Sequence, residues 1–147
     1  MAGASLHIDL DDRVVQRRLA EMLRRGQNLE PVFADIGEYL DLAHRERFDR
    51  EIDPQGKAWE PLAEKTIEQK RKKGRDGGIL VETGDLRDLL RYQISDDALE
   101  FGTDRIYGAT QQFGDEDRGI PAREWLGFSR EDMKEISDII GDWLVGE

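Results

Sequence analysis

The chain has 147 residues, a size typical of one domain that buries about two-thirds of its unfolded surface. Charged residues make up 37% of it, and the formal net charge of −11 argues against a surface that coats nucleic acid. It contains no cysteine, which excludes disulfides, thiolate catalysis and cysteine-ligated zinc.

The charge is unevenly placed along the chain. Residues 54–75 carry seven Lys or Arg against three Glu, whereas residues 115–147 carry ten acidic residues against four basic ones. This polarity predicts that copies attract each other head to tail, and two separately solvated faces are the alternative. No stretch approaches the roughly 20 apolar residues of a membrane span, and we expect a soluble chain without a cleaved export signal.

The first fifty residues predict a strand and two helices. Residues 5–10 alternate apolar and polar side chains, as a half-buried strand does. The first helix is expected from Asp11 or Asp12 to Arg25, where Gly26 stops it, with an apolar face of Val14, Val15, Leu19, Met22 and Leu23. The second is stronger and has Asn28 as its N-cap, with an apolar stripe of Leu29, Val32, Phe33, Ile36, Leu40, Ala43 and Phe48.

The middle of the chain changes character. Prolines and glycine prevent regular structure over residues 51–62, around Trp59, which is either a plug over the core or an interface anchor. Residues 63–73 have helix-forming composition but only Ile67 as a sizeable apolar side chain, which predicts an exposed helix or one ordered by a partner. A basic, glycine-rich loop at about 68–78 is expected to be the most mobile part of the protein.

Residues 79–90 are the stretch around which the chain is predicted to be organised. Three aliphatic residues lead into Thr83-Gly84-Asp85, and Leu86, Leu89 and Leu90 follow at helical spacing. The pattern indicates an extended piece that turns sharply into a short buried helix.

The last third predicts a hairpin and two further helices. Residues 92–95 and 98–103 form the hairpin around Asp96-Asp97, a short helix over 107–113 ends at Gly114, and residues 120–123 are extended. The final helix begins with a capping box of Ser129 and Asp132 and has an apolar stripe of Met133, Ile136, Ile140, Trp143 and Leu144. We expect a single α+β domain: a small, mainly antiparallel sheet packed by the two long helices, with more helix than strand.

The sequence contains no positive sign of an enzyme. Its two histidines, His7 and His44, lack metal-ligand spacing, and neither a phosphate-binding loop, a nucleophile elbow nor a dinucleotide motif is present. Carboxylates are so frequent that any catalytic pair would be chosen arbitrarily. We therefore predict no catalysis, no cofactor and no metal. A virion hydrolase, the rival interpretation, needs two inward-facing carboxyls roughly 5–10 Å apart in a cleft.

The basic residues suggest a second rival function. Lys70, Arg71, Lys72, Lys73 and Arg75 could neutralise phosphates in a small regulatory or nucleic-acid-associated protein. Aromatic residues for base stacking are lacking, and the rest of the chain is acidic, so a solvated loop is favoured. Arg123 and Trp125 are residue types typical of interface centres, and a core plug before the last helix is the equal alternative.

Five segments of the chain, taken in order, resemble a known family. They are 56–62 with Trp59 and Pro61, 79–87 with Thr83-Gly84 and Arg87, 101–103, 107–114 with Gln112-Phe113-Gly114, and 121–127 with Arg123 and Trp125. This series is similar to the phage virion morphogenesis proteins, the tail-completion family of contractile-tailed phages related to Mu and P2. The sequence departs from the family pattern at Gly108, Gln111 and Glu124.

The resemblance implies a structural protein without enzymatic activity that acts late in virion assembly. Such proteins complete the tail or its junction with the head, often as hexameric rings on the end of the tail tube. The implied partners are further copies of the chain, the tail tube or terminator and the head–tail connector, with no cofactor, membrane or nucleic acid. The implied location is the bacterial host cytoplasm during assembly and afterwards the tail or neck of the virion.

A ring of this kind needs surfaces for neighbouring subunits and for the tube. We expect the basic segment of residues 54–75 to help close the ring against an acidic neighbour. The side chains expected near the inter-subunit or tail-facing surface are Trp59, Lys70, Arg71, Lys72, Lys73, Arg87, Phe113, Arg123 and Trp125.

Overall fold

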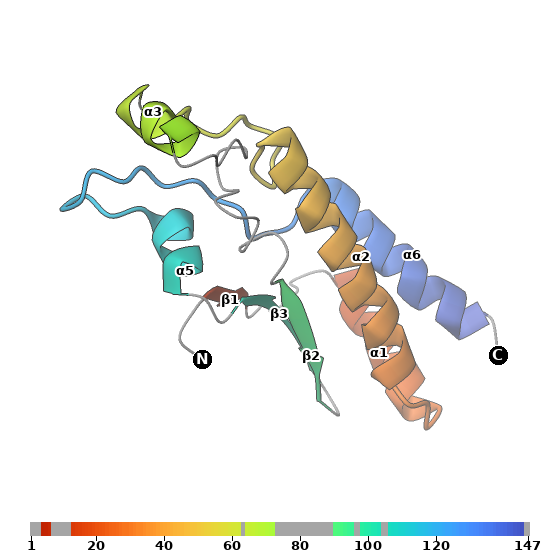
Figure 1. Cartoon of the computed structure of the whole chain (residues 1–147). Coiled ribbons are helices and arrows are strands. Elements are labelled where there is room, and N and C mark those ends of the chain that lie inside the picture. Colours follow the sequence, from red (N-terminus) through yellow and green to blue (C-terminus); the bar gives the residue numbers. More distant parts are fainter. Residues whose placement is uncertain are drawn as a thin grey trace.

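The computed structural model describes residues 4–6, 13–62, 64–72, 90–95, 98–103 and 106–145 (Figure 1). Within these ranges the elements in chain order are β1 (Ala4–Leu6), α1 (Arg13–Arg24), α2 (Glu30–Arg50), α3 (Glu64–Lys72), β2 (Arg91–Ile94), β3 (Leu99–Thr103), α5 (Ile106–Phe113) and α6 (Arg130–Val145). Helix exceeds strand, and the strands pair antiparallel, so the α+β prediction is confirmed.

The sheet has the order β1-β3-β2, with β3 in the centre. Tyr92 of β2 faces Phe101 of β3, as the predicted hairpin requires, although its turn at residues 96–97 lies outside the described residues. β1 pairs antiparallel with the other edge of β3. Residues 7–10 of the predicted first strand, and residues 79–89 of the predicted central junction, also lie outside the described part of the chain.

Helix α2 packs across the sheet because one stripe of it is apolar along its length. All members of the predicted stripe are buried except Ala43, which is half-buried. The ring of Tyr92 lies so close to α2 that a Cβ atom on Gly37 would stand 2.7 Å from it, which explains the glycine there. Leu29 takes the N-cap position rather than Asn28, but Asn28 Oδ1 still accepts a hydrogen bond from the backbone N–H of Glu30 at 3.0 Å.

The principal neighbours of α6 are α1 and α2, so these three helices form a layer beside the sheet (Figure 1). Arg18 of α1 donates from Nη1 to the carbonyl oxygen of Ser137 in α6 at 2.5 Å. On α1 only Val15 and Met22 of the predicted face are buried, and the expectation is wrong for Val14 and Leu23, which are exposed. Because α1 lies at the edge of this layer, its buried stripe is narrow.

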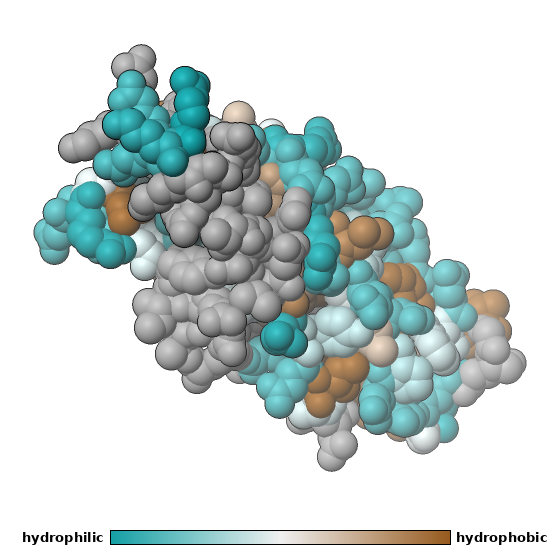
Figure 2. Space-filling view, viewed as in Figure 1, coloured by the Kyte–Doolittle hydropathy of each residue, from teal (hydrophilic) through white to brown (hydrophobic). Residues whose placement is uncertain are grey.

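The core extends from the helices to the irregular segment around Trp59. Phe48 of α2 lies 5.4 Å from the ring of Trp59 and 5.9 Å from that of Trp125, measured between ring centroids. Figure 2 shows a largely hydrophilic surface over the helices, interrupted by separate apolar patches. Across the described ranges, the helices are too short or too polar to cross a membrane.

Candidate functional site

Residues 121–127 run beside α5 without belonging to a sheet, and the side chain of Gln112 holds them there. Its Oε1 accepts hydrogen bonds from the backbone N–H groups of Trp125 and Leu126, both at 3.0 Å. Its Nε2 donates to the carbonyl oxygen of Leu126 at 3.0 Å. One glutamine therefore satisfies backbone groups that would otherwise need a neighbouring strand.

Three of the predicted interface residues fasten the same segment to its surroundings. Trp125 Nε1 donates to the carbonyl oxygen of Gly108 at 2.8 Å, and Trp59 Nε1 donates to that of Glu124 at 2.7 Å. Arg123 donates from Nε to the carbonyl oxygen of Glu60 at 2.8 Å. We call Trp59, Gln112, Arg123 and Trp125 the hub, because together they tie α5, residues 51–62 and residues 121–127 into one unit.

Three of the four hub side chains are buried, and that of Gln112 is half-buried. Trp125 is fully buried, and Trp59 and Arg123 are 5% and 6% exposed, so their burial supports the core alternative. Burial lowers the pKa of Arg123, and the nearby Glu60 opposes that effect. The position of Trp59, Arg123 and Trp125 close to an inter-subunit or tail-facing surface stays a prediction.

Phe113 differs from the hub residues because it is 76% exposed. It ends α5 and begins a projecting segment, residues 113–120, which we call the finger (Figure 1). Gly114 has a φ of 74°, and a Cβ atom there would stand 2.8 Å from the backbone nitrogen of Ala122. The Asp115–Ile120 bridge closes the finger, and Arg118 pairs with Asp115 at 2.9 Å. Phe113 is therefore displayed on a fixed support.

The remaining predicted interface residues lie on or beyond α3. The structure confirms an exposed helix there, with Arg71 and Lys72 exposed in its last turn. Lys70 also belongs to this helix. Lys73, Arg87 and residues 73–78 of the predicted mobile loop lie outside the described residues.

A groove of about 760 Å³ lies between the C-terminal half of α2, residues 52–56 and the start of α6. Its apolar lining includes Leu42, which is 68% exposed, and Phe128, which is half-buried. Arg50 and Arg130 are exposed basic residues of the same lining. No local sequence pattern predicts this groove, because its walls come from segments about eighty residues apart.

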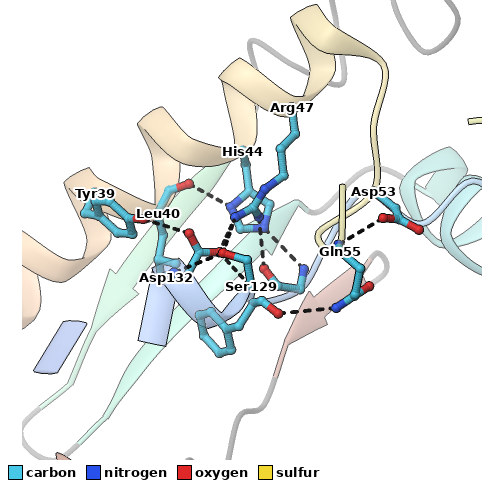
Figure 3. A network of polar contacts seen from close by, with 10 residues as sticks. Tyr39, Leu40, His44, Arg47, Asp53, Gln55, Ser129 and Asp132 are labelled. Carbon is cyan, nitrogen blue, oxygen red and sulfur yellow. Dashed lines mark hydrogen bonds and ion pairs between the residues drawn. The ribbon is translucent and has the colours of Figure 1, made fainter. Parts of the chain in front are cut away.

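The floor of the groove is a buried ion pair between Arg47 and Asp132 (Figure 3). Asp132 also accepts hydrogen bonds from the hydroxyl of Tyr39 at 2.7 Å and from the backbone N–H of Ser129 at 3.0 Å. Burial alone would raise the pKa of Asp132, but the Ser129 N–H, Arg47 and Tyr39 outweigh it and hold that pKa below its ordinary value. Burial and the neighbouring Asp132 raise the pKa of Tyr39.

His44 joins this floor to the segment that precedes α6. Its Nδ1 lies 2.7 Å from the carbonyl oxygen of Leu40, and the N–H of Gly127 donates to Nε2 at 3.3 Å, an arrangement that fits a neutral ring protonated on Nδ1 (Figure 3). Burial lowers the pKa of His44 to about 4. With Asp132 ionised and His44 neutral, both groups are committed to internal contacts. Among the described residues no cluster of acidic and histidine side chains could hold a metal ion.

The arrangement is that of a rigid scaffold which presents a finger and a groove on separate surfaces. Residues 10–145 match the phage virion morphogenesis family, and the chain belongs to that family, whose members act in virion assembly. A similar protein is "Putative capsid assembly protein G" of Escherichia phage Mu, which is 28% identical over 145 residues, covering 92% of this chain and 91% of the relative. No solved structure matches the chain.

Proposed function

We propose that the chain completes the phage tail, or joins it to the head, as a ring of copies on the end of the tail tube. Membership of the phage virion morphogenesis family supports an assembly role. The Mu relative is named for capsid assembly, and a position at the junction of head and tail accommodates both that name and a tail-completing role. The protein would assemble in the bacterial cytoplasm and remain in the tail or neck of the virion.

The observation that carries this proposal is that the hub makes contacts within the chain, whereas Phe113 beside it points outward. The hydrogen bonds of the hub side chains are internal, and they hold the support on which Phe113 is exposed. A closed ring needs two different surfaces that fit each other, and a further surface for the tube. The finger and the groove supply a pair of this kind.

We further propose that the role is structural rather than catalytic. The buried carboxylate of the groove, Asp132, is bound by Arg47, Tyr39 and Ser129 and keeps a lowered pKa, which is unsuitable for a general acid. A nucleic-acid role would rest on the basic segment of residues 70–75, in which Arg71 and Lys72 are exposed, and salt-dependent binding of a DNA duplex at physiological salt would favour it instead.

The test is to add purified protein to tails that were assembled without it. Negative-stain microscopy should show density capping one end of each tail, and the tails should become able to join heads. If tails stay bare and heads remain separate, the proposed role is wrong. Multi-angle light scattering of the protein alone, in parallel, shows whether a ring forms before the tail is met.

A further inference from the structure

We propose that the finger of one copy docks into the groove of the next copy, with Phe113 against the apolar wall around Leu42 and Phe128. The inference rests on the proposed ring, since it names the contact by which neighbouring copies would join. It assigns a partner to two features that have none within the described part of the chain, an outward aromatic ring and a large open groove.

The backbone of the finger is held in one conformation by contacts within the chain. The Asp115–Ile120 bridge and the tight packing at Gly114 fix its backbone, and Gln112, the residue just before Phe113, is anchored by its hydrogen bond to the carbonyl oxygen of Leu126. Docking would therefore cost little conformational entropy, which is the usual penalty for burying a flexible loop. Aromatic side chains on rigid supports are the typical anchors of protein interfaces.

The groove offers a matching surface. Leu42 is 68% exposed on its rim, and Pro54 and Phe128 extend the apolar lining. The Arg47–Asp132 ion pair and its hydrogen bonds hold the floor, so the cleft does not depend on a ligand to keep its shape. A Phe side chain is a suitable occupant for an apolar wall backed by a rigid floor.

Charges of both signs lie on the finger and in the groove. Beyond Phe113 the finger exposes Glu116, Asp117 and Arg118, and the groove lining holds Arg50 and Arg130 beside Glu46, Asp53 and Glu131. In the proposed register Glu116 and Asp117 lie against Arg50 and Arg130, because other registers would bring them against the acidic members of the lining. Complementary and repelling pairs of this kind fix the register of an interface more than they raise its affinity.

The contact must form between copies rather than within one chain. Figure 1 places the finger beside α5, away from the α2 and α6 pair that forms the groove. The hub fastens the base of the finger, so the finger cannot swing across without breaking those hydrogen bonds. Two complementary surfaces at different places on one molecule give a head-to-tail contact, which repeats around a ring until it closes.

Cysteine cross-linking tests the contact directly, because the chain contains no native cysteine. A double variant with Glu116→Cys and Arg50→Cys should form disulfide-linked multimers under mild oxidation, both in concentrated solution and on tail ends. The control pairs Glu116→Cys with Arg17→Cys, an exposed position on α1. Multimers at the control level in both settings would overturn the proposed contact.

A charge exchange provides a second test that needs no oxidation. Arg50→Glu should weaken binding to tails at least tenfold, and adding Glu116→Arg on the same chain should restore most of it. If the second change gives no recovery, residues 50 and 116 are not neighbours and the register is wrong. Phe113→Ala should abolish assembly at unchanged melting temperature.

The outcomes separate the contact from the proposed function. If cross-links form but tails never join heads, the contact stands and the tail-completing role is wrong. If wild-type protein caps tails while the Arg50–Glu116 exchange and the cross-links both fail, the role stands and the finger docks elsewhere, for example on the tail tube.

Discussion

Two ionisable side chains, His44 and Arg47, are tolerated on the buried face of α2 because neighbouring polar groups satisfy them. Arg47 pairs with Asp132, and the ring of His44 lies between the Leu40 carbonyl and the Gly127 N–H. His44 also packs against Phe101 of β3, with ring centroids 4.6 Å apart. Breaking a buried ion pair by removing one partner typically costs about 3–5 kcal/mol, so this network is a point where the fold is vulnerable.

The buried histidine makes stability depend on pH. The pKa of His44 is 6.5 ordinarily and about 4 in the folded chain. Between these pH values His44 is protonated in the unfolded chain but neutral in the folded chain. The contribution of His44 to the free energy of unfolding is therefore complete above about pH 6.5, and it declines by about 3 kcal/mol as the pH falls toward 4. The lowered pKa of Asp132 places its own titration below this window.

His44→Gln should lower stability at neutral pH and flatten this decline. Urea unfolding of both proteins at pH 7 and near pH 4.5 should show a stability gap that narrows on acidification. The second histidine, His7, is present in both proteins, so the comparison isolates His44. A gap that stays constant with pH would contradict the assignment of a neutral, buried ring.

Gln112 and its neighbour Gln111 form a matched pair for testing the hub. Gln112→Ala leaves the N–H groups of Trp125 and Leu126 without their acceptor and should reduce the free energy of unfolding by about 2–3 kcal/mol. Gln111 Oε1 is buried but has no hydrogen-bond partner within the described part of the chain, so Gln111→Ala should cost clearly less. Chemical denaturation measures both, and equal losses would mean that Gln112 acts through packing alone.

At the scale of elements, the start of α6 shows how a short sequence signal becomes a contact between helices. Ser129 Oγ accepts from the N–H of Asp132 at 2.9 Å, and Asp132 accepts from the N–H of Ser129, which confirms the predicted capping box. The same Asp132 also pairs with Arg47 of α2, so the cap fixes where α6 begins relative to α2.

Ser129→Ala removes half of this box. The expected loss is about 1 kcal/mol, the usual effect of losing an N-cap side chain. Thermal unfolding followed by circular dichroism measures it, with Ser95→Ala at the exposed end of the hairpin as the control that should change stability very little. A loss at Ser129 no larger than that at Ser95 would show that Asp132 holds the helix start without the hydroxyl.

Local patterns predicted most elements, whereas contacts between distant segments could not be predicted. The stripe of α2, the hairpin and the capping box each depend on residues a few positions apart, and the structure confirms them. The helical spacing could also have predicted that His44 and Arg47 are buried, since they lie four and seven residues after the buried Leu40. Trp59 and Glu124, by contrast, are sixty-five positions apart. No local pattern indicates which carbonyl oxygen will accept the hydrogen bond of the Trp59 indole.

At the scale of the whole molecule, the proposed ring would bring together copies that each carry a net charge of −11. Repulsion between two such copies acts over their whole surfaces, whereas the proposed pairs of Arg50 and Arg130 with the finger are few and local. Salt screens both, but the Debye length shrinks from about 30 Å at 0.01 M to about 8 Å at 0.15 M, which removes the long-range repulsion first.

Self-association should therefore strengthen as NaCl rises from about 0.01 M to about 0.15 M, because the screened repulsion outweighs the loss of a few surface ion pairs. Sedimentation velocity at matched protein concentrations measures this through the fraction of oligomer. Phe113→Ala, which keeps the net charge but loses the apolar anchor, should stay monomeric at both salt levels and serves as the control. If association of the wild-type chain weakens with salt instead, local ion pairs dominate the contact and the finger binds chiefly through Glu116 and Asp117 rather than Phe113.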